Sequence, residues 1–119
     1  MAYPISLNGI AAVIPAGASL SSPTPLGAGA LAGLVMPAVW TPANLSLQAS
    51  ADGGLTWQEL QDGLGNAVIF TVSAGIAFNI NPSLWCGFNF FVVRSGILGA
   101  PVAQAVAATI TLQTIPQFG

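Results

Sequence analysis

Glycine and proline interrupt this chain at short intervals, and their spacing limits the secondary structure that it can form. The 119 residues include 14 glycines and 9 prolines. One of these two residue types therefore occurs about once in every five positions, which is too often for a helix of three turns but leaves room for strands of ordinary length. The spacing predicts an all-β chain of short strands joined by turns.

Two runs of sequence show the alternation of apolar and polar residues that is typical of a strand. In residues 44–49, Leu45, Leu47 and Ala49 lie on one face and polar side chains lie on the other. Residues 105–113 alternate in the same way. This period of two indicates strands with one buried face. We expect further strands at residues 11–14, 31–36, 67–72, 75–80 and 88–95.

The length of the chain predicts a single domain that can bury a core without disulfides or metals. Residues 31–119 contain most of the predicted strands, and we expect them to form an antiparallel β-sandwich of the jelly-roll type. Residues 1–30 are less regular. We expect them to form an irregular, extended N-terminal arm that becomes ordered on a neighbouring molecule.

Charged side chains are almost absent from the sequence. Arg94 is the only cation, Asp52, Glu59 and Asp62 are the only acids, and there is no histidine. Binding to nucleic-acid phosphates needs several cations, and acid–base catalysis or a metal centre needs groups that this chain lacks or uses in turns. We therefore expect no enzymatic activity, no cofactor, no metal and no nucleic-acid partner.

The chain is also strongly apolar, with a mean hydropathy of +0.79. The most apolar run, residues 26–40, is interrupted by three glycines and Pro37, and it is shorter than the ~20 residues that a spanning helix needs. Pro4 and Pro15 interrupt the apolar N-terminal sequence, which has no basic residues, so we expect neither a signal peptide nor a membrane partner. An exterior with so little charge predicts cover by other copies of the chain or by a larger assembly.

Residues 88–95 are apolar on both faces of the predicted strand. A strand that is apolar on both faces either is central and covered on both sides or has one face at a subunit interface, and because a sandwich covers only one face of each sheet, we favour the interface. We expect Phe91, Val93 and Arg94 to lie at an interface between subunits. Arg94 is also suited to pair with an acid or to bridge backbone carbonyls at the end of the strand.

The sharpest motif is Ser50-Ala51-Asp52-Gly53-Gly54-Leu55-Thr56-Trp57, which fits the Asp-box pattern Ser-x-Asp-x-Gly-x-Thr-Trp. The Asp52 carboxylate is placed to accept hydrogen bonds from its own turn, and Gly53 and Gly54 allow positive φ angles. We expect a structural hairpin turn, formed by Ser50, Asp52, Gly53, Gly54, Thr56 and Trp57, between strands at 45–50 and 56–60. Glu59 and Asp62, near the end of that hairpin, are expected to be solvated.

Two tryptophans leave open a second class of function. Trp40 and Trp85 lie beside predicted turns, where an exposed indole face can stack on a sugar. Burial in the core is the commoner position of tryptophan, and exposure of either side chain would favour a carbohydrate-binding module. The single cysteine, Cys86, is expected to be a small buried residue.

Three segments taken together resemble a group of small structural proteins of tailed bacteriophages. They are residues 36–43 (MPAVWTPA) continuing into 45–57, residues 88–96 (FNFFVVRSG) and residues 101–105 (PVAQA). Related chains often have an arginine near Ala107 and Ala108, where this sequence has no charge. The resemblance implies a β-sandwich or jelly-roll subunit of the virion, and it carries over no catalytic residue.

The resemblance and the composition together predict a head decoration (cement) protein or a tail-associated protein. We expect the chain to assemble in the host cytoplasm, to form a homo-oligomer and to dock on phage capsid or tail proteins through apolar surfaces. The alternative is a carbohydrate-binding or adaptor module of a tail fibre or baseplate, with a glycan as ligand.

Overall fold

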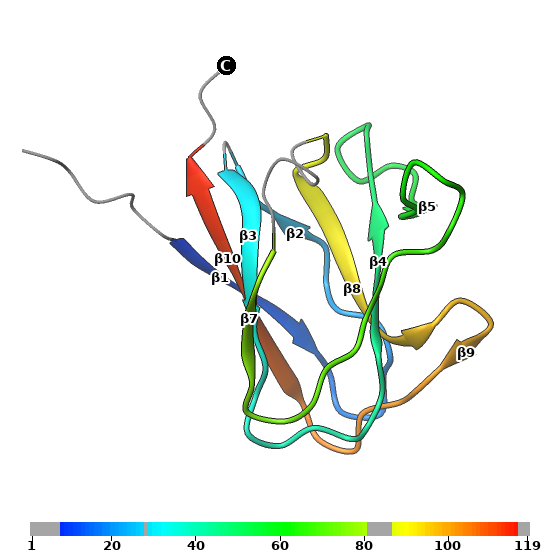
Figure 1. Ribbon diagram of the computed structural model, residues 1–119. Helices are drawn as coiled ribbons and strands as arrows, with labels where there is room; N and C mark the ends of the chain where they lie inside the picture. The colour runs from blue at the N-terminus through cyan, green and yellow to red at the C-terminus, as the bar shows by residue number, and fades with distance from the viewer. Residues whose placement is uncertain (1–7, 28, 81–86, 117–119) are drawn as a thin grey trace, which may run out of the picture.

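The computed structural model describes residues 8–27, 29–80 and 87–116, which fold into one all-β domain of two antiparallel sheets (Figure 1). The all-β single domain predicted from the spacing of glycine and proline is confirmed. The jelly-roll type of connectivity stays a prediction. No helix in the described part of the chain is long and apolar enough to cross a membrane.

The first sheet has four strands in the order β1-β10-β3-β7. They are β1 (Asn8–Ile14), β10 (Ala108–Pro116), β3 (Gly29–Val35) and β7 (Ala77–Asn79). Every neighbouring pair is antiparallel, and the register between β10 and β3 shifts between Gln113 and Thr114.

The second sheet has six strands, and β8 and β4 form its centre. Residues Leu45 to Ala49 of β4 pair with Ser95 to Phe91 of β8. β2 and β5 lie outside them, β6 also pairs with β4, and β9 pairs with the end of β8. The bounds are β2 (Thr24–Pro25), β4 (Leu45–Ala49), β5 (Gln58–Glu59), β6 (Ile69–Phe70), β8 (Phe90–Ile97) and β9 (Ala100–Pro101).

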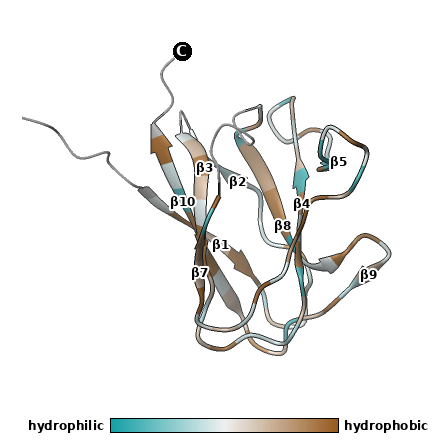
Figure 2. Ribbon diagram, in the orientation of Figure 1, coloured by the Kyte–Doolittle hydropathy of each residue, from teal (hydrophilic) through white to brown (hydrophobic). Residues whose placement is uncertain are grey.

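Alternate residues of the long strands point between the sheets and form the core. Figure 2 shows this apolar character along β8 in particular. Removing these side chains from water is the main stabilising contribution to the fold, at roughly 25 cal/mol per Å² of apolar surface. The largest buried apolar side chains are Ile14, Leu31, Leu34, Leu45, Leu47, Phe91, Val93, Ile110 and Leu112.

The expected irregular N-terminal arm is wrong for residues 8–14, which form β1, and the strand expected at residues 11–14 is confirmed. β1 pairs with β10 over its whole length, from Asn8 opposite Thr114 to Ile14 opposite Ala108. Ala12 and Ile14 are fully buried in the core. Because residues 9–14 are all glycine or apolar, they show no alternation, and the pairing with β10 was not evident from the sequence. Residues 1–7 lie outside the described residues.

Candidate functional site

The structure brings the Asp-box residues together in a tight turn between β4 and β5. The Asp52 carboxylate accepts hydrogen bonds from the Thr56 N–H (2.9 Å) and from the Thr56 and Ser50 hydroxyls. The Ser50 hydroxyl oxygen accepts the Gly54 N–H at 2.8 Å. These bonds, chiefly those from Thr56, lower the pKa of Asp52 from its ordinary 3.8 to about 2.

The glycines and the tryptophan of the turn have separate roles. Gly53 and Gly54 have φ angles of 75° and 95°, a region that residues with a Cβ rarely adopt. Trp57 is half-buried and packs edge-on against Phe90, with the ring centroids 5.2 Å apart. The returning strand is only β5, which begins at Gln58, so it is shorter than the sequence predicted.

Replacing Asp52 by Asn should lower the melting temperature at neutral pH, because an amide nitrogen cannot accept the Thr56 hydroxyl hydrogen. Since folding lowers the pKa of Asp52, the carboxylate contributes full stability above pH 3.8 and loses it as the pH falls towards about 2. Thermal unfolding followed by circular dichroism should therefore show a difference in melting temperature between wild type and Asp52→Asn at neutral pH, and this difference should become smaller near pH 2. A difference that does not change with pH would contradict this role of the turn.

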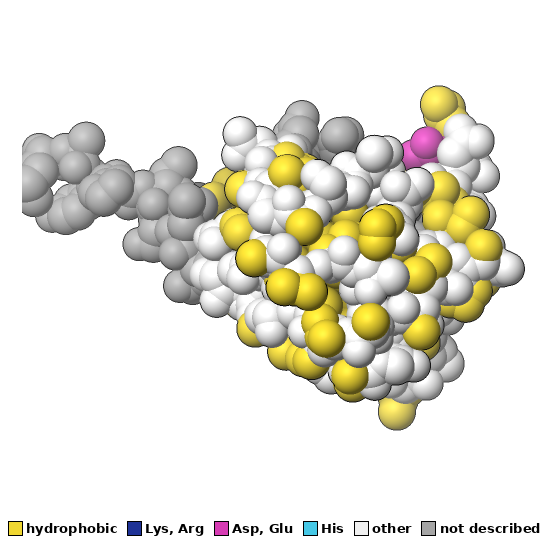
Figure 3. All heavy atoms as spheres, turned by 90° about the horizontal axis from the view of Figure 1, so that it is seen from below, with side chains coloured by type: hydrophobic (Ala, Val, Ile, Leu, Met, Phe, Trp, Pro, Cys, Tyr) yellow, Lys and Arg dark blue, Asp and Glu magenta, His cyan; other side chains and the backbone are white. Residues whose placement is uncertain are grey.

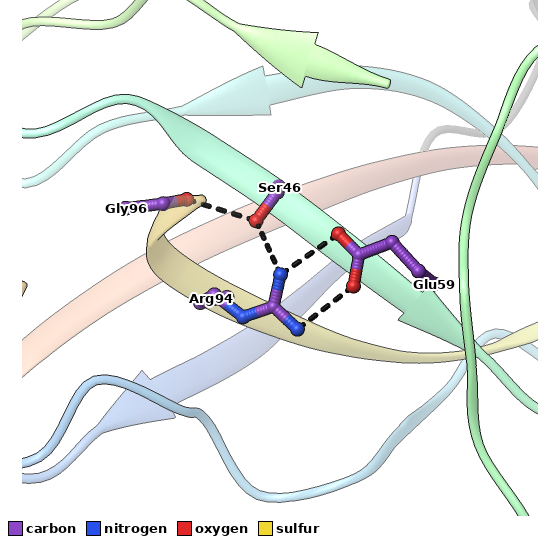
Figure 4. A network of polar contacts seen from close by, with 4 residues as sticks. All are labelled: Ser46, Glu59, Arg94 and Gly96. Atoms are coloured by element: carbon purple, nitrogen blue, oxygen red, sulfur yellow. Dashed lines mark hydrogen bonds and ion pairs between the residues drawn. The ribbon is translucent and has the colours of Figure 1, made fainter. Parts of the chain in front are cut away.

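The chain's one cation forms a buried ion pair with one of its acids (Figure 4). Both terminal nitrogens of Arg94 donate to the Glu59 carboxylate at 2.8 Å, and one of them also donates to the Ser46 hydroxyl at 3.1 Å. The Ser46 hydroxyl in turn donates to the Gly96 carbonyl. Arg94 pairs with an acid, as expected, but Glu59 is not solvated, because its side chain is only 12% exposed.

The subunit interface expected along residues 88–95 is wrong for the three side chains that were assigned to it. Phe91 is 1%, Val93 0% and Arg94 4% exposed, so none of them is available to a partner. Phe91 and Val93 belong to the core between the sheets, whereas Trp57 and Glu59 cover the opposite face of β8 at Phe90 and Arg94. Both faces of this strand are thus covered within one chain.

Trp40 is not exposed as a sugar platform. It is 8% exposed, belongs to the core cluster, and its indole N–H donates to the Ala43 carbonyl at 3.2 Å. This burial counts against the carbohydrate-binding alternative. Trp85 and Cys86 lie outside the described residues. Among the described residues, no three His, Cys, Asp or Glu side chains are grouped so that they could hold a metal ion.

Gln104 joins three loops, and sequence reasoning did not identify it as a site residue. Its side-chain oxygen accepts the Thr41 N–H at 2.8 Å, and its amide nitrogen donates to the Thr41 carbonyl and the Ser95 hydroxyl. Its backbone N–H donates to Ala18, and its carbonyl accepts from Gly17. The side chain is completely buried, so these bonds replace water and fix the loops relative to one another.

The three loops that Gln104 joins form one end of the sandwich, which we call the apolar end and define as residues 15–19, 37–43 and 102–107. No residue in these loops is charged. Val39 is 63% and Val106 46% exposed, and exposed alanines and prolines surround them. Figure 3 views this end directly: hydrophobic side chains are spread across it, and acidic atoms are visible only at the rim.

The two exposed carboxylates belong to turns that lie between β4 and β6, outside the apolar end. Asp52 is bonded within its turn, and Asp62 accepts the N–H groups of Asn66 and Leu64, which lower its pKa. The apolar end therefore combines a fixed shape with an uncharged surface, which is what burial against another apolar surface requires. Comparisons with protein-family models, curated proteins and solved structures found no match.

Proposed function

We propose that this protein is a non-enzymatic structural component of a bacteriophage particle, a capsid decoration protein that associates with itself and docks on the head shell. The observation that supports this proposal most is the apolar end. Exposed Val39 and Val106 on loops fixed by Gln104 form a surface that is unfavourable in water and favourable against an apolar partner. The resemblance of segments 36–57, 88–96 and 101–105 to phage structural proteins supports the choice of a phage head as the partner.

The hydrogen bonds and the ion pair that the charged side chains form within the fold support a role without catalysis. Each of the chain's four charged side chains already has a partner within the fold: Arg94 with Glu59, and Asp52 and Asp62 with their own turns. A general acid or base must be able to reach a substrate and must have a pKa near the working pH. The lowered pKa values of Asp52 and Asp62 move them away from that range.

Binding of the purified chain to isolated phage heads tests this function. The wild-type chain should cosediment with heads, and the number of bound copies should saturate at a value that fits the symmetry of the shell. The double variant Val39→Lys, Val106→Lys should lose about tenfold or more in affinity, because each lysine ammonium would have to be desolvated at the contact. The double variant Leu55→Lys, Leu64→Lys is the matched control, since these side chains are 84% and 86% exposed in turns outside the apolar end, and it should bind normally.

Two outcomes would contradict the proposal. One is that the wild-type chain fails to bind heads at all. The other is that Leu55→Lys, Leu64→Lys weakens binding as much as Val39→Lys, Val106→Lys, which would mean that general surface charge, and not the apolar end, determines docking. Heads that lack other decoration proteins give the cleanest substrate for the assay.

A further inference from the structure

The edges of the two sheets differ greatly in length. β7, β2 and β5 are edge strands of two or three residues, which offer few unpaired backbone groups to another chain. β1 is the remaining edge of the four-stranded sheet and has seven residues, NGIAAVI. It contains no proline and no charged residue, the features that usually prevent pairing between edges. Figure 1 shows β1 beside β10.

The direction of one carbonyl shows which backbone groups of β1 point away from β10. The Val13 carbonyl accepts the Ser22 N–H at 3.3 Å, so Val13 points away from β10. Residues two apart in a strand point their N–H and carbonyl groups in the same direction. The backbone groups of Gly9 and Ala11 therefore also point away from β10, on the side where β1 pairs with no further strand of its sheet.

We propose that β1 is a self-association surface on which β1 of a second copy pairs antiparallel, about a two-fold axis at Ile10. In this register Gly9 lies opposite Ala11 of the second copy, and each of these two pairs exchanges both of its N–H···O bonds. The two four-stranded sheets become one continuous eight-stranded sheet. The register uses only Gly9 and Ala11, so it leaves the bond between Ser22 and Val13 intact.

The side chains of β1 agree with this pairing. Ile10 is half-buried at the margin of the core, and it would face Ile10 of the second copy across a narrow, non-hydrogen-bonded pair. Ala11 is exposed on the outer face and is small enough to admit the second strand. All four charged residues belong to the other sheet or its connections, so the approach of two β1 strands is not opposed by charge.

This inference names the surface for the self-association that the proposed function includes, but it does not use the apolar end. Copies joined through β1 would keep residues 37–43 and 102–107 free to dock. A failure of the β1 contact would change the oligomeric state in solution, whereas a failure of the proposed function would abolish binding to heads. The two results are therefore separable.

Sedimentation velocity of the purified chain against concentration is the test. The wild-type chain should approach twice the chain mass of 11.9 kDa. Ala11→Pro should weaken the dimer by about tenfold or more, because it places a ring at the contact and removes an N–H that makes no hydrogen bond to any described residue of the monomer. Ala11→Lys retains the N–H and should weaken the dimer less, by a few-fold, because the two lysines would lie diagonally to each other on the same face of the sheet.

Ala77→Pro and Ala77→Lys are matched controls on the opposite edge of the same sheet. The Ile76 carbonyl accepts the Met36 N–H, and the Ile80 N–H donates to the Ala32 carbonyl, so the backbone groups of residues 76 and 80 point towards β3. Because these directions alternate along a strand, the backbone groups of Ala77 point away from β3. Both controls should dimerise normally. Amide exchange gives a second readout, since Gly9 and Ala11 should become protected as the concentration rises.

Three results would overturn the inference. They are a wild-type chain that remains monomeric at every soluble concentration, an Ala11→Pro or Ala11→Lys dimer as stable as the wild type, or equal weakening by the Ala77 variants. Melting temperatures of all four variants close to that of wild type would show that the monomer fold is intact, so that a lost dimer reports on the edge itself.

Discussion

The Phe91→Ala variant should lose about 3–5 kcal/mol of unfolding free energy, the range for truncating a fully buried aromatic side chain. Phe91 is 1% exposed and is the largest side chain buried to this degree among the residues that the structure describes. Its ring packs in the cluster between the sheets with Leu47 and other apolar residues of β4 and β10. Phe91→Asp should give no folded protein, because it would place a carboxylate in that cluster.

Chemical denaturation of Phe91→Ala beside Phe88→Ala measures this effect. Phe88 is 40% exposed and lies just before β8, so removing its ring should cost less than about 1 kcal/mol. Equal losses for the two variants would contradict the assignment of Phe91 to the core. A Phe91→Asp chain that folds as a monomer but no longer associates would instead place Phe91 at a subunit interface, as the sequence predicted.

The Glu59→Gln variant should lose about 3–5 kcal/mol, because it leaves the buried charge of Arg94 without its counter-ion. The two side chains are only 5% and 12% exposed, so water cannot replace the lost carboxylate. The double variant Arg94→Met, Glu59→Leu should recover most of the loss, since it removes both charges together. A double-mutant cycle of Arg94→Met and Glu59→Leu, measured by urea unfolding, gives the coupling energy between the two side chains directly.

Asp62→Asn is the matched control for the change in net charge. It also removes one negative charge, but from an exposed turn, and the amide oxygen can still accept the N–H groups of Leu64 and Asn66. Its effect on unfolding should be small. If Glu59→Gln were no more destabilising than Asp62→Asn, the ion pair would contribute nothing specific to the fold.

The sequence allowed the class of fold and much of the sheet structure to be predicted, because those features depend on local patterns. The alternation in residues 44–49 became β4, and that in 105–113 overlaps β10. The Asp52 turn was also predictable, since all its hydrogen bonds join residues within four positions of one another. β1 was predicted only at residues 11–14, because its residues are glycine or apolar at nearly every position and show no alternation.

The contacts that the sequence did not reveal join residues far apart in the chain. Arg94 and Glu59 are separated by 35 positions, and Gln104 and Thr41 by 63. No local pattern distinguishes an arginine that pairs inside the fold from one that faces a partner. The same limit explains why Phe91 was assigned to an interface: the side chains that cover the other face of β8 come from a different part of the chain.

The copy number of this chain in purified phage particles, measured by quantitative mass spectrometry against the major capsid protein, tests the central proposal most directly. A decoration protein docked through its apolar end should be present in numbers of the same order as the major capsid protein. A count of a few copies per particle would place the chain in the tail or at a single vertex and would contradict the decoration role. Absence from the particles would contradict a virion function altogether.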